Sequence, residues 1–183
     1  MQADRLLGQE VVDVDGNVDD RRGTVSVFNG PSPDIWVFDT IKEEAGAVAA
    51  WLKDRNSEGV APHEIGIFVR STAQIERAKS AAHQSGITFK VLDDHMETTT
   101  GKMSISSMHL AKGLEFRVVA VMACDDEIIP LQERMESVAD DADLEEVYDT
   151  ERHLLYVACT RARDRLLVTS VEPESEFLDD LKG

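Results

Sequence analysis

The sequence predicts an α/β domain in which helices cover a mostly parallel sheet. Short apolar runs alternate with segments of helical period, and the connections between them are short. This alternation favours strand–helix–strand units, whose strands lie parallel in one sheet. The chain has 183 residues, 42% of them hydrophobic, which suffices for one sizeable core and is short for two.

The first residues stand apart from this pattern. Residues 1–23 show little periodicity, so we predict an arm or a truncated element, followed by one domain over 24–183. The segment Asp13–Asp20 has the composition of a calcium loop, but it lacks the spacing and terminal Glu of an EF-hand. We therefore predict a turn there.

The first regular unit begins with a strand at Trp36–Phe38 and continues into a helix that ends near Arg55. Thr40, with Glu43 three residues later, predicts a capping box that opens this helix. Trp36 and Trp51 are expected to fill the core. The buried face of the helix is expected to comprise Ile41, Ala45, Val48, Ala49 and Leu52.

The second unit repeats the first in type. Residues 65–69 form a continuous apolar run, which suits a strand covered on both faces. Ser71 and Gln74 predict the cap of a second helix, which should end before Gly86. The remaining elements are predicted as strands at 88–91, 103–107, 118–124 and 166–170 and a helix at 149–163.

The charge is strongly acidic and unevenly distributed. A net charge of -17 argues against a nucleic-acid ligand, which draws on Lys and Arg. Most of the excess lies in residues 125–151, where 12 acidic residues face one basic residue, and we predict a solvated acidic loop at about 125–148. The segment that follows carries Arg152, Arg161, Arg163 and Arg165. A local basic site can therefore coexist with an acidic exterior.

Features that the sequence lacks limit the expected localisation and metal content of the protein. It has no apolar run of bilayer length and no signal-peptide pattern at its start, so we expect a cytoplasmic protein. Cys124 and Cys159 are too few for a disulfide framework and have no His cluster at zinc spacing. We expect core thiols and no metal site.

A first polar cluster follows the strand predicted at 103–107. Ser107 and His109 offer hydrogen bonds to a phosphodiester, and Lys112 supplies a point charge. Gly113 permits close backbone approach or a positive φ. Glu115 stands between two apolar residues and needs a partner such as a sugar hydroxyl. The residue types alone also fit an ordinary polar loop with Lys112 paired to Glu115. Active sites of such sheets lie at the carboxyl ends of strands, which makes the positions of the polar clusters informative.

A second cluster ends the helix predicted at 149–163. Thr160, Arg161 and Arg163 follow its apolar face, and Arg165 comes soon after. Cations near a helix C-terminus are favoured by the helix dipole, so these arginines have a purely structural explanation as well.

The order of residues in both clusters is more specific than their types. HLAKGLEF (109–116) and LLYVACTRAR (154–163) resemble motifs V and VI of the UvrD/Rep family of superfamily 1 DNA helicases, with Ser107 in place of the usual Thr. IGIFVRS (65–71) resembles, more weakly, a short strand motif of the same family. The resemblance implies a RecA-like, P-loop-NTPase-like three-layer sandwich, namely the second motor domain of such an enzyme.

The resemblance also implies roles for individual residues. Gly113 and Glu115 would face the nucleotide, with Glu115 at the ribose. Arg161 would be the arginine finger, which contacts the terminal phosphate of ATP held by the other motor domain. A planar, permanently charged guanidinium suits that task.

The resemblance also implies that four residues bind single-stranded DNA. The resemblance places Ser107 and His109 on the strand, with the charge of Lys112 beside them. Arg70, at the end of the weaker motif, would touch the DNA backbone.

The expected parts of a complete motor are not all present. Gly101–Ser104 lacks the preceding Gly and the Ser or Thr of a Walker A loop, and Asp125 and Asp126 are read as the start of the acidic loop. ATP and Mg²⁺ would therefore be held mainly by an absent first RecA-like domain of the same parent chain. The resemblance implies a 3′-to-5′ helicase, of which this fragment alone should hydrolyse nothing.

Two alternatives remain at this stage. The chain could be a RecA-like interaction module that has lost catalysis and uses its acidic segment as a working surface. A receiver-like or flavodoxin-like regulatory domain shares the alternating pattern, but it leaves the strings Lys-Gly-Leu-Glu and Thr-Arg-Ala unexplained.

Overall fold

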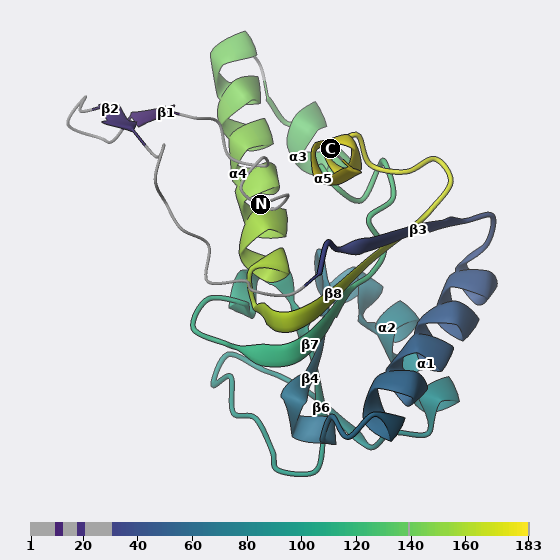
Figure 1. Ribbon diagram of the computed structural model, residues 1–183. Helices are drawn as coiled ribbons and strands as arrows, with labels where there is room; N and C mark the ends of the chain where they lie inside the picture. The colour runs from purple at the N-terminus through teal and green to yellow at the C-terminus, as the bar shows by residue number, and fades with distance from the viewer. Residues whose placement is uncertain (1–9, 13–17, 21–30, 139, 183) are drawn as a thin grey trace.

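A six-stranded sheet in the order β3-β8-β7-β4-β6-β5 forms the centre of the protein (Figure 1). The computed structural model describes residues 10–12, 18–20, 31–138 and 140–182. All neighbouring strands of this sheet run parallel, which confirms the predicted fold class. The strands are β3 (Asp34–Phe38), β4 (Ile65–Val69), β5 (Phe89–Val91), β6 (Met103–Ser107), β7 (Phe116–Val121) and β8 (Ala162–Val171).

The predicted N-terminal arm lies mostly outside the described residues. Within it, β1 (Glu10–Val12) and β2 (Val18–Asp20) pair antiparallel with each other. The predicted turn at 13–20 falls on residues that the structure describes only from Val18 onward.

Helices α1 (Ile41–Ser57) and α2 (Ile75–Ser85) cover one face of the sheet (Figure 1). The side chain of Thr40 accepts a hydrogen bond from the amide of Glu43 at 3.2 Å, which confirms the predicted start of α1. The predicted burial of Ile41 is wrong, because packing against the sheet begins at Glu44 and Ile41 is 54% exposed. The residues buried in α1 are Glu44, Ala45, Val48, Ala49, Trp51 and Leu52.

The start of α2 also differs from the prediction. A 3-10 turn at Thr72–Gln74 precedes the helix, and the side chain of Ser71 makes no capping bond. The end is as predicted, because Gly86 follows in the left-handed region with φ of 73°.

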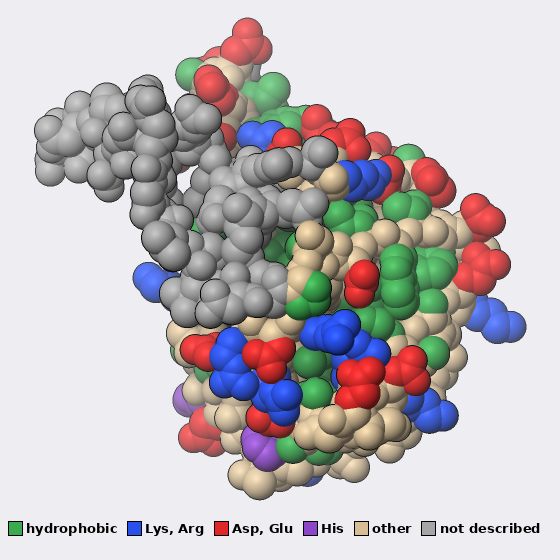
Figure 2. Space-filling view, in the orientation of Figure 1, with side chains coloured by type: hydrophobic (Ala, Val, Ile, Leu, Met, Phe, Trp, Pro, Cys, Tyr) green, Lys and Arg blue, Asp and Glu red, His purple; other side chains and the backbone are tan. Residues whose placement is uncertain are grey.

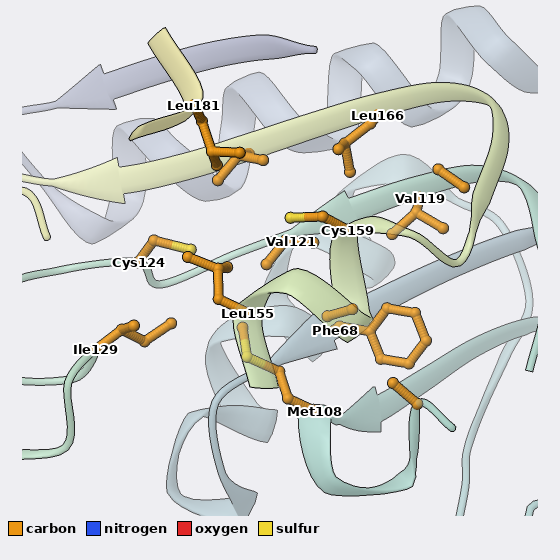
Figure 3. Close-up of a cluster of buried hydrophobic side chains, with 14 of the residues drawn as sticks. Phe68, Met108, Val119, Val121, Cys124, Ile129, Leu155, Cys159, Leu166 and Leu181 are labelled. Carbon is orange, nitrogen blue, oxygen red and sulfur yellow. The ribbon is translucent and has the colours of Figure 1, made fainter. Parts of the chain in front are cut away.

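Helices α4 (Asp141–Cys159) and α5 (Phe177–Lys182) cover the opposite face, together with the segment between β6 and β7. Their apolar side chains meet those of β4 and β7 in a second core (Figure 3). A sheet covered on both faces is the predicted three-layer sandwich. No helix in the described part of the chain is long and apolar enough to cross a membrane.

The acidic segment is partly helical, which corrects the predicted loop. A short helix α3 (Gln132–Glu136) lies within it, and α4 begins at Asp141 rather than near residue 149. The side chain of Asp140 accepts a hydrogen bond from the amide of Asp143 at 2.9 Å, and acidic residues in a first turn complement the helix dipole. Acidic side chains gather over the upper part of the view in Figure 2, where α4 begins in Figure 1.

A buried polar network joins α1 and α2 to the carboxyl ends of β7 and β8. Glu44 is fully buried, and its carboxylate accepts hydrogen bonds from Arg77, from the amide of Ala123 at 3.1 Å and from the hydroxyl of Thr169 at 2.6 Å. Arg77 also donates twice to Asp125, at 2.6 and 3.0 Å. Asp125, in the connection that follows β7, is therefore a member of this network.

Candidate nucleotide and nucleic-acid interfaces

The predicted site residues lie at two opposite edges of the sheet. Ser107 ends β6 and His109 follows it, so both lie at the carboxyl edge. Glu115 directly precedes β7, and Arg161 directly precedes β8, so both lie at the amino edge. The two edges are separate because residues 108–115 cross one face of the sheet from the end of β6 to the start of β7.

The amino edge is shaped by a turn that contains Gly113. The amide of Leu114 donates to the carbonyl of Ala111 at 3.1 Å, and Gly113 has φ of 86°. This positive φ is one of the two roles predicted for the glycine. Leu114 is buried in the core, whereas Lys112 and Glu115 on either side of it are exposed. These two charged residues form no ion pair in the described structure. The alternative of an ordinary polar loop with Lys112 paired to Glu115 is therefore contradicted.

Arg161 lies against this turn. Its side chain donates to the carbonyls of Val157 at 3.0 Å and Leu114 at 3.4 Å, and to the hydroxyl of Thr160 at 3.1 Å. The amide of Phe116 in turn donates to the carbonyl of Arg161 at 3.0 Å. All groups that hold the guanidinium are neutral, and no carboxylate of the described residues pairs with it. Its charge therefore lies uncompensated beside the turn at 112–115.

Neighbouring arginines differ from Arg161 in this respect. Arg163 donates to Asp164 at 3.0 Å, and Arg117 donates to the same carboxylate at 2.9 Å and to Glu64 at 3.3 Å. Hydrogen bonds from Arg117 and then Arg163 hold the pKa of Asp164 below its ordinary value. These cations are paired within the domain and need no ligand.

The groups at the amino edge fit a nucleotide. The guanidinium of Arg161 suits phosphate oxygens, and the exposed carboxylate of Glu115 suits the hydroxyls of a sugar. Gly113 carries no side chain at the turn between them, and nothing lies within 4 Å of where a Cβ would stand. When bound here, a nucleoside triphosphate would supply the phosphoryl group for hydrolysis.

At the carboxyl edge, Arg70 is buried rather than exposed. Its side chain is 2% exposed and donates to Glu151 through Nε at 2.6 Å and Nη2 at 2.5 Å. The remaining nitrogen, Nη1, lies 2.9 Å from Nε2 of His109. In this arrangement Arg70 binds protein groups, and His109 rather than Arg70 is exposed at this edge.

Glu151 is the member of this site that the sequence did not reveal. Its carboxylate is fully buried and accepts further hydrogen bonds from the amide of Leu131 at 3.1 Å and from Arg134 at 2.9 Å. Burial acts to raise the pKa of Glu151, but the bonds and charge of Arg70, with Leu131 and Arg134, outweigh it and lower the pKa. Its one sequence signal is its position four residues before Leu155, on the apolar face of α4.

The two remaining residues of this edge differ in exposure. Ser107 is 8% exposed, and His109 is exposed at the end of the Arg70–Glu151 pair. Partial burial lowers the pKa of His109, and the charge of Arg70 lowers it further. His109 is therefore neutral near pH 7.

Known proteins match the chain chiefly over its second half. Residues 91–173 match the family model of the UvrD-like helicase C-terminal domain. The ATP-dependent DNA helicase UvrD1 of Mycobacterium leprae is 35% identical over 100 residues, which cover 49% of this chain and 12% of that protein. DNA helicase II of Rickettsia typhi is 27% identical over 147 residues, which cover 79% of this chain and 21% of that protein.

The fold is also found in a solved structure, the C-terminal domain of a possible DNA helicase from Lactobacillus plantarum WCFS1. The TM-score is 0.61 at 23% sequence identity, with 85% of this chain and 86% of that chain covered. At this identity the match concerns the fold.

Proposed function

We propose that the chain acts as the second motor domain of an ATP-dependent 3′-to-5′ DNA helicase. The proposal starts from the match of residues 91–173 to the family model of the UvrD-like helicase C-terminal domain. In this proposal ATP and Mg²⁺ bind between the amino edge of the sheet and a first RecA-like domain of the same polypeptide. The domain then contributes residues to the nucleotide and to single-stranded DNA, and it is inactive alone.

The observation that carries the proposal is the position of Arg161. Its guanidinium lies within 3.4 Å of the carbonyl of Leu114, beside Gly113 and Glu115, without a carboxylate partner among the described residues. An arginine finger must keep its positive charge available for the phosphate of the nucleotide. The hydrogen bonds from Arg161 to neutral groups orient its guanidinium without neutralising that charge. Glu115 is exposed in the same place and would accept from the ribose.

The carboxyl edge would provide part of the DNA track. His109 is exposed there, and Ser107 lies two residues before it at the end of β6. Lys112 is exposed at the other end of the same connection, in the turn at the amino edge. We assign these residues to phosphate contacts, because Lys112 and His109 form no ion pair in the described structure and Ser107 offers a hydroxyl donor. Arg70 belongs to the same site through its bond to His109 rather than through a contact of its own.

The test joins the chain to a P-loop domain, in its longer polypeptide or by addition of the separate domain, and measures DNA-stimulated ATP hydrolysis. We expect no hydrolysis by the chain alone. With the P-loop domain present, Arg161→Ala should lower kcat by about 10³-fold or more, since an arginine finger contributes on this scale. Arg161→Lys should remain strongly impaired, because one ammonium cannot replace the planar guanidinium.

Arg163→Ala is the matched control. Arg163 lies two residues later but is exposed and paired with Asp164. Arg163→Ala should therefore change kcat by less than about threefold, which corresponds to well under 1 kcal/mol in the activation free energy. Wild-type hydrolysis by Arg161→Ala would contradict the finger. Stable binding of the two domains without any hydrolysis by the unmodified pair would favour an interaction module.

A further inference from the structure

The contact between Arg70 and His109 defines the chemical state of the imidazole. The two nitrogens, Nη1 and Nε2, lie 2.9 Å apart. A guanidinium has only donors, so Nε2 of His109 must accept and cannot carry a proton. A neutral imidazole then has its one proton on Nδ1. The geometry thus selects one of three states that the ring could adopt.

Arg70 is held firmly enough to impose this choice. Two of its nitrogens are bound to the carboxylate of Glu151, and both side chains are almost completely buried, at 2% and 0% exposure. Glu151 is itself fixed by donors from Leu131 and Arg134. The bidentate contact uses Nε and Nη2, which leaves Nη1 directed at the ring of His109.

The surrounding charges act in the same direction as the contact. Arg70 follows β4, Arg134 lies on α3, and both place positive charge near His109, while Glu151 on α4 offsets them only in part. A second proton on the ring would have to stand against the guanidinium of Arg70, from which it would also remove the acceptor.

We propose that Arg70 is a positioning residue that holds His109 as the neutral Nδ1–H tautomer, so that the ring offers one N–H donor to a phosphodiester oxygen of single-stranded DNA. Nδ1 has no hydrogen-bond partner among the described residues, and His109 is exposed. The identity of this ligand rests on the proposed function, whereas the tautomer does not. Arg70 therefore affects DNA binding without touching DNA.

The first experiment tests the tautomer without any DNA. Long-range proton–nitrogen NMR correlations on the whole chain with nitrogen-15-labelled histidine report which ring nitrogen carries the proton. The chain has 5 histidines, and the signal of His109 is assigned by its loss in His109→Asn. We expect the Nδ1–H pattern at pH 7.5 in the wild type. A protonated Nε2 at this pH overturns the inference.

Two substitutions at His109 test the donor while leaving the buried Arg70–Glu151 pair in place. The amide nitrogen of Asn can occupy the position of Nδ1, whereas that of Gln extends to the position of Nε2. Fluorescence anisotropy with a single-stranded oligothymidine should show binding within about threefold of wild type for His109→Asn. His109→Gln should weaken binding about tenfold, the loss of one charge-assisted hydrogen bond.

The outcomes separate the two ideas. Equal loss in both variants overturns the Nδ1 donor, and unchanged binding in both overturns the contact itself. If the wild-type chain binds no oligothymidine while its ring shows the Nδ1–H pattern, the proposed function fails and the positioning by Arg70 stands. Arg70→Gln gives an independent check. In a folded variant, the NMR pattern of the His109 ring should shift toward the tautomer with the proton on Nε2. Retention of the wild-type Nδ1–H pattern overturns the role of Arg70.

Discussion

Replacement of Glu44 by Ala should strongly destabilise the domain. The carboxylate is fully buried and accepts from Arg77, Ala123 and Thr169. Its removal leaves the amide of Ala123 and the hydroxyl of Thr169 unsatisfied, at a cost of about 1–3 kcal/mol for each group. Arg77 keeps its two bonds to Asp125, which limits the charge penalty. We therefore expect a total loss of about 3–5 kcal/mol, the usual result of breaking a buried ion pair.

Urea titration followed by circular dichroism measures this loss. The midpoint should fall while the m-value stays unchanged, because the surface exposed on unfolding is the same. Glu43→Ala is the matched control, since Glu43 is the adjacent residue of the same type and is exposed; its effect should stay below about 1 kcal/mol, a helix-dipole contribution. A loss of less than about 1 kcal/mol for Glu44→Ala would refute the reasoning that this network ties α1 to the sheet.

Two further predictions concern close packing and pH. Gly66→Ala would place a Cβ 2.6 Å from a ring carbon of Phe116 and should destabilise the domain by about 1–3 kcal/mol. Gly46→Ala in α1 is the control: its new Cβ would have its nearest contact at 3.8 Å, and the substitution should stabilise the domain by about 0.5–1 kcal/mol. Equal effects of the two substitutions in urea titrations would contradict the close approach at Gly66. The lowered pKa of Glu151 means that its contribution to stability is present above the ordinary value of 4.5 and is lost as pH falls through the folded pKa. Acid titration should therefore be shallower for Glu151→Gln than for the wild type, and identical curves would show that the pairing with Arg70 contributes nothing.

Local patterns in the sequence predicted the layers of the fold well. The apolar run at 65–69 located β4 at the same residues as the structure, because a strand buried on both faces leaves a continuous apolar signal. Predictions at helix ends were weaker. Asp140 begins α4 within a run of acidic residues, where charge alone resembles a solvated loop and the capping geometry is not visible.

The candidate site was predicted residue by residue but not in its arrangement. Short strings identified Gly113, Glu115 and Arg161, which do meet at one edge. The Arg70–Glu151 pair joins residues 81 positions apart, and an arginine at a strand end gives no indication of a distant carboxylate that will bury it. Long-range pairing of this kind depends on the packing of α4 against the sheet, which no local pattern encodes.

The bond between the amide of Phe116 and the carbonyl of Arg161 also restricts where the chain can change in length. It is the first rung of the β7–β8 pairing, in which Phe116 stands opposite Ala162. One residue inserted on either side of this hydrogen bond would shift the register of the pairing by one residue. Because successive side chains of a strand point to opposite faces, such a shift moves side chains from one face of the sheet to the other. The insertion would also move Arg161 relative to Leu114, to whose carbonyl its side chain donates. Insertions are better accommodated at 93–102, a largely exposed connection whose length does not determine where the guanidinium lies.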